Sequence, residues 1–186
     1  METISVKYER HRNCLKTGDI ILCKNPKWIG RQITALDDGA YYTHSLVVFW
    51  QSGRLFTFDS TETGVHPELA SIKMKQYSDF CVVRPQKNET EISSALEKLF
   101  QYSEKGIKYD FAQILKIAIY QKTGINIFKK NNPTRDICSE LAWYYTQYFP
   151  LPCYAKERLT RPFFTPNDFI RYADENDTTI LFNNFL

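Results

Sequence analysis

Short apolar runs bounded by turn residues predict the strands of this chain. Four of them, at 20–23, 44–50, 54–59 and 80–84, have the length and the composition of strands. Gln51, Ser52 and Gly53 lie between the second and the third run, so we expect these two strands to form a β-hairpin. A further run at 178–182 is expected to add an edge strand.

Apolar residues at helical spacing predict the helices. The pattern indicates helices at 26–36, 89–102, 109–121 and 138–148. The stretch 109–121 is apolar all round, so we expect it to pack on two sides. A last short helix should begin near Thr165, with Pro166 in its first turn. Helices that alternate irregularly with hairpin-linked strands favour an α+β fold around a small antiparallel sheet.

Composition and charge narrow the class of protein. The 186 residues are 43% hydrophobic and contain neither repeats nor a low-complexity linker, which predicts one globular domain over 1–186. The formal net charge of +3 comes from scattered residues, so we expect no nucleic-acid partner. We find no apolar segment typical of a signal peptide or a membrane span, and expect a cytoplasmic protein. The oligomeric state has no signature in the sequence.

The cysteines point to chemistry at one position. Five cysteines with no CxxC pair argue against a disulfide scaffold and against a zinc site, so we expect neither a metal nor an organic cofactor. Cys23 and Cys81 lie inside predicted strands and are interpreted as core thiols. Cys138 differs, because a helix begins at it and helix N-termini favour a thiolate.

A histidine in the first half of the chain is the natural partner for this thiol. His44 opens a predicted strand, which holds it on a stiff element. A nucleophile and its base must be close in space, whatever their order along the chain. Cys138 and His44 together therefore indicate a cysteine-dependent hydrolase or acyltransferase. His11 and His66 have no such partner segment and are interpreted as surface residues.

Several segments together resemble one family. In chain order they are GDII (18–21), YTHSLVV (42–48), LFTFD (55–59) with GV (64–65), GIKYDF (106–111), ICSEL (137–141) and TPND (165–168). This set resembles the circularly permuted, NlpC-type branch of the papain-like cysteine hydrolases, including YiiX-like proteins, in which the histidine segment precedes the cysteine segment. The resemblance spans 18–168.

The resemblance implies a fold and three roles. It implies the permuted papain-like fold, with the cysteine helix packed against the sheet that carries the histidine. It makes Cys138 the nucleophile, His44 its base and Asp59 the group that orients His44. This chain departs from the family at the third position, because it has Asp59-Ser60 where many relatives have Glu followed by Ala.

The register of the hairpin decides between two carboxylates. With a two-residue loop, Gln51 pairs with Arg54, and Asp59 becomes the diagonal neighbour of His44 on the same face. With a three-residue loop, Glu62 would take that face instead. Ser52-Gly53 suits the two-residue turn, which favours Asp59.

Three further polar residues have structural interpretations. Asp19 is expected to cap a turn and Asp110 to open a helix. For Tyr42, two residues before His44, lining of the cleft and packing in the core both stay open.

The resulting hypothesis is a thiol hydrolase that cleaves an amide bond through an acyl-enzyme. The resemblance implies peptides of the peptidoglycan kind as substrates. One alternative is a thiol acyltransferase or hydrolase acting on lipid or N-acyl substrates, which resembles lecithin retinol acyltransferase. Another alternative is a non-catalytic binding module on the same fold.

Overall fold

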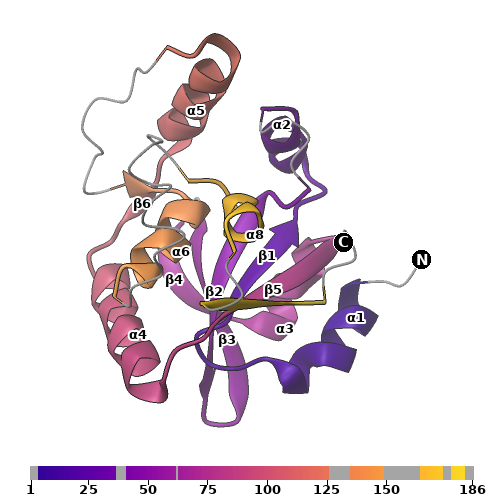
Figure 1. Ribbon diagram of the computed structural model, residues 1–186, viewed down its shortest axis with the longest axis vertical. Helices are drawn as coiled ribbons and strands as arrows, with labels where there is room; N and C mark the ends of the chain where they lie inside the picture. The colour runs from indigo at the N-terminus through magenta and orange to yellow at the C-terminus, as the bar shows by residue number, and fades with distance from the viewer. Residues whose placement is uncertain are drawn as a thin grey trace.

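A six-stranded antiparallel sheet forms the centre of the computed structural model, which describes residues 4–36, 41–61, 63–125, 135–148, 164–173 and 177–182 (Figure 1). The strand order is β4-β3-β2-β1-β5-β8. The strands are β1 (Ile20–Lys24), β2 (His44–Gln51), β3 (Arg54–Thr61), β4 (Gly64–Leu69), β5 (Asp79–Pro85) and β8 (Thr178–Leu181). A separate parallel pair joins β6 (Lys108–Tyr109) to β7 (Arg135–Asp136).

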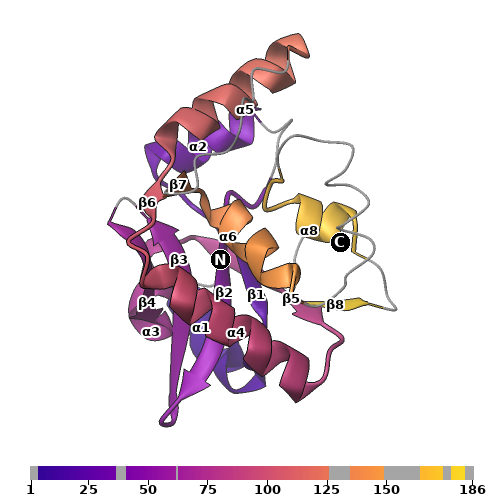
Figure 2. The ribbon, with the colours of Figure 1, turned by 90° about the vertical axis from the view of Figure 1, so that its left-hand side faces the viewer.

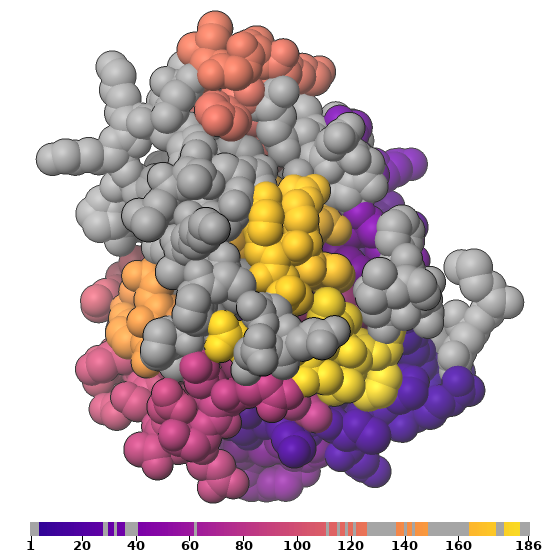
Figure 3. Space-filling view, viewed as in Figure 1, coloured from indigo at the N-terminus to yellow at the C-terminus, as the bar shows by residue number. Residues whose placement is uncertain are grey.

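Helices cover both faces of the sheet and one of its ends. They are α1 (Ile4–His11), α2 (Trp28–Leu36), α3 (Ala70–Lys73), α4 (Glu89–Ser103), α5 (Phe111–Thr123), α6 (Cys138–Thr146) and α8 (Asp168–Arg171), with 3₁₀ turns η1 (Arg12–Cys14) and η2 (Met74–Gln76). Figure 2 shows α2 and α5 side by side beyond the end of the sheet, and residues of the two helices contact each other. In the space-filling view, the yellow atoms of α8 and β8 lie across the middle of the face seen in Figure 1 (Figure 3).

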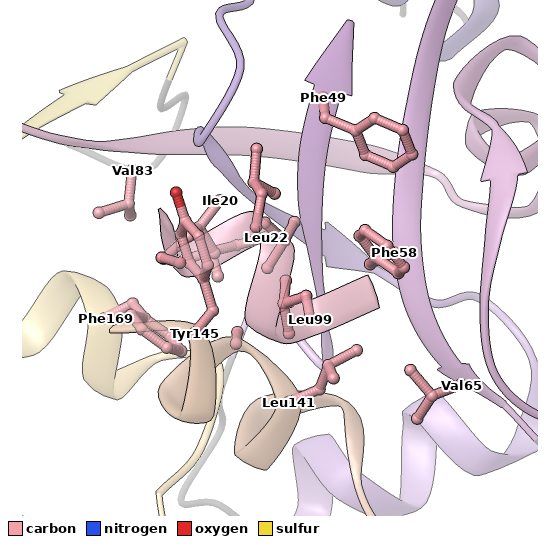
Figure 4. Close-up of a cluster of buried hydrophobic side chains, with 14 of the residues drawn as sticks. Ile20, Leu22, Phe49, Phe58, Val65, Val83, Leu99, Leu141, Tyr145 and Phe169 are labelled. Atoms are coloured by element: carbon pink, nitrogen blue, oxygen red, sulfur yellow. The ribbon is translucent and has the colours of Figure 1, made fainter. Parts of the chain in front are cut away.

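Alternation along the strands divides the core between the two faces. On one face, Val47 and Phe49 of β2 pack with Leu141 and Tyr145 of α6 (Figure 4). On the other face, Leu46 and Val48 lie in a second cluster with Tyr8 of α1 and Ala70 of α3. A valine, leucine or phenylalanine side chain adds about 1.5–3 kcal/mol to the free energy of unfolding when it is fully buried. The chain is therefore α+β, with helices on both faces of its sheet.

The hairpin has the predicted register. Gln51 pairs with Arg54, and the following pairs continue to Val47 with Phe58. Ser52 and Gly53 both have positive φ, at 49° and 71°, as a type I′ turn requires. The other predicted strands and the four longer helices are also present, with ends that differ by at most two residues.

Some elements differ from the expectations. The sequence pattern missed α1, α3 and β4, and β4 was hard to recognise because it carries Pro67 on an edge strand. The last short helix begins at Asp168, after the proline, because the Asp168 side chain accepts hydrogen bonds from Thr165 and holds the preceding turn. On α5, the described isoleucines are half-buried and the helix contacts α2, so packing on two sides stays a prediction.

Candidate active site

The histidine and the carboxylate favoured by the hairpin register are in contact. His44 is the first residue of β2, and Asp59 lies near the end of β3. The distance between His44 Nε2 and Asp59 Oδ1 is 2.6 Å, and both side chains are buried. The two-residue turn places them diagonally across the strand pair, as predicted. Glu62, the other carboxylate considered, lies outside the described residues.

The third predicted residue lies beside the same histidine. Cys138 is the first residue of α6, and its side chain lies beside His44, whose pKa it helps to raise. Because Nε2 faces Asp59, Nδ1 is the ring nitrogen left for the thiol. Ser45, the next residue of β2, donates a hydrogen bond of 2.9 Å from Oγ to the Cys138 carbonyl. This bond ties the start of the cysteine helix to the strand of the histidine.

The residues just before β2 are held by hydrogen bonds between their backbone and two other segments of the chain. Asn167 accepts a hydrogen bond from the Tyr42 N–H at 3.0 Å and donates one to the Tyr42 carbonyl. The Thr43 N–H donates to the Cys23 carbonyl at 2.9 Å. The TPND segment therefore holds the strand end that carries His44. Tyr42 itself is buried in the core, which decides between its two interpretations.

Two further residues contact the pair His44 and Asp59: Lys73 at the end of α3, and Tyr77 just after η2. The sequence analysis missed both. The Lys73 ammonium contacts Asp59 Oδ2 and lies 3.5 Å from Glu68 Oε2. The Tyr77 ring stacks on His44, with centroids 5.4 Å apart. A spacing of four residues is the only sequence signal that links Lys73 with Tyr77.

Charge and burial together set the ionisation of the pair. Burial alone would lower the pKa of His44, but the Asp59 carboxylate and then Cys138 outweigh it and raise that pKa to about 10. Burial would likewise raise the pKa of Asp59, but His44 and Lys73 outweigh it and lower the value. His44 is therefore an imidazolium and Asp59 a carboxylate at neutral pH. Such a histidine has a proton to donate.

Two hollows of different character meet at this site. A small apolar cavity is lined by Cys138, with isoleucines of α2 and α5 and the Phe164 ring. A second, polar groove is lined by His44 together with threonine, amide and charged side chains. Ile33, Thr43 and Tyr109 line both hollows. A bound molecule that spans them would place an apolar part beside the thiol and a polar part beside the histidine.

The other thiols and histidines are not members of the predicted triad, although Cys23 pairs with His44 across β1 and β2, and His66 pairs with Asp59 across β3 and β4. Cys23 and Cys81 are buried, and burial raises the pKa of Cys81 to about 12 and that of Cys23 well above its usual range. His11 stacks on a phenylalanine ring and is half-buried, so its interpretation as a surface residue was wrong. His66 lines the polar groove. Cys153 lies outside the described residues.

The two remaining carboxylates have the structural roles expected for them. Asp19 accepts a hydrogen bond from the Lys16 N–H at 2.7 Å, which closes its turn, and it also binds Arg84 through both oxygens. Asp110 is the N-cap of α5 and accepts from the Gln113 N–H. In the part of the chain that the structure describes, no three His, Cys, Asp or Glu side chains gather in a way that could hold a metal ion. No described helix has the length and the apolar character needed to cross a membrane.

Comparison with known proteins supports the fold and goes no further. No protein-family model matches the chain, and no curated protein matches it significantly. Among solved structures, the metalloprotein YiiX of Escherichia coli O157:H7, a DUF1105 protein, matches with a TM-score of 0.55 and 18% identity. The chain has a YiiX-like fold. The match covers 71% of this chain and 64% of YiiX, and the word metalloprotein describes YiiX.

Proposed function

We propose that this chain is a cysteine-dependent hydrolase that cleaves an amide bond through an acyl-enzyme. The observation that carries the proposal is the position of Cys138 beside His44, which is hydrogen-bonded to Asp59, at the junction of a helix start and a strand start. A thiol, a histidine and a carboxylate in this order are the parts of a nucleophilic triad. The histidine strand precedes the cysteine helix, which supports the finer assignment to the circularly permuted, NlpC-type papain-like fold.

In the proposed reaction, Cys138 reacts as a thiolate paired with the His44 imidazolium: its sulfur attacks the amide carbonyl and forms a tetrahedral oxyanion. Backbone N–H groups at the start of α6 supply part of the stabilisation of that oxyanion. The His44 imidazolium gives its proton to the departing nitrogen, which leaves as an amine and a thioester on Cys138. A water molecule then attacks the thioester while His44 takes its proton, and the acid product leaves with the thiolate and the imidazolium restored.

The two hollows give the substrate a direction. The leaving amine must reach His44 to receive a proton, so it lies in the polar groove that His44 lines. The acyl part then points to the cavity beside Cys138. Peptides of the peptidoglycan kind are the first substrate class to test, with the part beyond the scissile nitrogen in the groove.

The apolar cavity favours a second candidate, the hydrolysis or transfer of an aliphatic acyl group from an N-acyl or lipid substrate. The isoleucines that line it offer no charged or amide partner to a polar peptide side chain. Matched amides with acyl groups of two to twelve carbons separate the candidates. A rate that rises with chain length favours the aliphatic substrate, and a preference for polar peptidyl amides favours the peptide.

The test of the proposal is labelling with thiol-reactive acyl and peptidyl probes, followed by peptide mapping. We expect the label on Cys138, and we expect Cys138→Ala to keep the fold and lower turnover by at least about 10³-fold. Cys14→Ala is the matched control, because Cys14 is an exposed thiol outside the site. Labelling of Cys14 alone, with full turnover in Cys138→Ala, would contradict the proposal. Binding of the substrates without turnover by the wild-type chain would favour the binding module.

A further inference from the structure

We infer that Lys73 is a positioning residue for the proposed reaction: its ammonium holds one oxygen of Asp59 and so keeps the other oxygen on His44. The inference rests on the proposed function, because it assigns a role within the same site. Lys73 does not touch the thiol or the reacting atoms. It acts through Asp59, one residue further from the chemistry.

The burial of Lys73 is the first observation that supports this role. Its side chain is 4% exposed and that of Asp59 is 1% exposed. An ammonium so deeply buried costs several kcal/mol unless it is paired, and the partner that Lys73 contacts is the carboxylate of the triad. The two oxygens of Asp59 are thus divided between two cations, with Oδ1 on His44 and Oδ2 on Lys73. A carboxylate held at both oxygens has little freedom to rotate.

The charges around the pair are balanced. Lys73 also lies 3.5 Å from Glu68, which is partly exposed. With His44 protonated, two cations (Lys73 and His44) face two carboxylates (Asp59 and Glu68). A neutral cluster avoids the cost of an uncompensated buried charge.

The other titratable groups that face the cluster are Cys23 of β1, His66 of β4, Tyr77 and Cys138 of α6. Burial raises the pKa of both Cys23 and Tyr77 well above their usual ranges, so these two stay neutral at working pH. Changes in the pH profile of a Lys73 variant therefore do not come from Cys23 or Tyr77.

The expected consequence of removing the ammonium has a definite sign. Lys73 is one of the groups that lower the pKa of Asp59. Without it, burial is opposed by His44 alone, the pKa of Asp59 rises, and the site loses its carboxylate at a higher pH. The acid limb of the profile of kcat/KM against pH should therefore move to higher pH. Freed at Oδ2, Asp59 also positions His44 less well, and a displacement of about 1 Å can lower kcat by about 10²-fold.

The test compares three variants. Lys73→Met removes the charge and keeps the length, Lys73→Arg keeps the charge, and Lys75→Met is the control, since Lys75 is an exposed lysine two residues along. We expect Lys73→Met to lower kcat by roughly 10- to 100-fold with little change in KM. The same variant should move the acid limb of the kcat/KM profile to higher pH. Lys73→Arg should recover much of kcat, and Lys75→Met should behave as wild type.

A kcat and a pH profile unchanged in Lys73→Met would overturn the inference. The same question is answered without turnover by the ¹⁵N signals of His44, whose low-pH change follows the titration of Asp59 and should move to higher pH in Lys73→Met. If that shift is absent, Lys73 has no positioning role. If it is present while no substrate is turned over, the proposed function fails and the structural part of the inference stands. Lys73→Gln replaces Lys73→Met if the latter does not fold.

Discussion

Asp59→Asn should lower the pKa of His44 from about 10 to below 6.5. Asparagine keeps the shape of the side chain but has no charge. The Asp59 carboxylate is the largest of the groups that raise the pKa of His44, and burial acts in the opposite direction. Because one pKa unit corresponds to about 1.4 kcal/mol, the rise from 6.5 to about 10 represents roughly 5 kcal/mol in favour of the imidazolium. With the carboxylate removed, burial should dominate and leave His44 neutral at pH 7.

The raised pKa of His44 also determines how the stability of the fold changes with pH. Since the pKa of His44 is raised in the folded chain, its contribution to stability is fully present below pH 6.5 and is lost as the pH rises towards about 10. Asp59→Asn should remove this alkaline dependence of the free energy of unfolding. Urea titrations at pH 6 and at pH 10 measure it.

The direct assay is ¹⁵N NMR of labelled histidine between pH 5 and pH 11. We expect the wild-type His44 ring to stay doubly protonated to about pH 10, and the ring of the variant to be neutral at pH 7. Turnover at pH 7 should fall strongly, since the corresponding change in serine-protease triads costs about 10⁴-fold. Glu62→Gln, the other carboxylate that the sequence offered, should have little effect.

One control separates charge from folding. Asp59→Asn leaves the Lys73 ammonium buried without its carboxylate, which costs about 3 kcal/mol or more. The double variant Asp59→Asn/Lys73→Met removes that burden and should still show the lowered pKa of His44. The reasoning is refuted if His44 in either variant keeps a pKa within about one unit of the wild-type value.

Two further predictions concern stability and are checked by chemical denaturation. Gly18→Ala should destabilise by more than Gly53→Ala, because both glycines have positive φ but a Cβ at Gly18 would lie 2.7 Å from the Tyr145 hydroxyl, whereas at Gly53 no atom lies within 4 Å; equal losses would contradict this. Arg84→Met should cost about 3 kcal/mol, because it leaves the buried Asp19 carboxylate without its two hydrogen bonds of 2.7 and 2.8 Å from the guanidinium. A loss below about 1 kcal/mol would mean that water replaces the guanidinium.

The parts of the site that the sequence predicted are those set by local chemistry. Ser52-Gly53 adopts a turn with two positive φ values, and that turn determines the register of the five residue pairs between β2 and β3. The position of Asp59 relative to His44 follows from this register alone. The cysteine was recognisable because a helix begins at it.

The parts of the site that the sequence could not predict depend on contacts between segments that are far apart in the chain. Lys73 has an ordinary lysine sequence environment, and only the fold places its ammonium beside Asp59. The same holds for the ring of Tyr77 over His44 and for the apolar cavity, whose lining comes from α2, α5 and the residues around Phe164. Hydrophobic periodicity identifies which residues are apolar but not which elements enclose a common space.

The position of the site at the end of the sheet explains how the two segments meet. Alternation puts His44 on the face of Leu46, which packs with α1 and α3, whereas α6 packs on the opposite face. A histidine two residues further along β2 would lie among core side chains, separated from the cysteine helix by the sheet. Only at the first residue of β2 can the ring reach past the strand end to a thiol at the first turn of α6. The hydrogen bonds between Asn167 and Tyr42, and the bond from Ser45 to the Cys138 carbonyl, hold that junction from both sides. The geometry therefore depends on where the strand and the helix begin and not on their order along the chain.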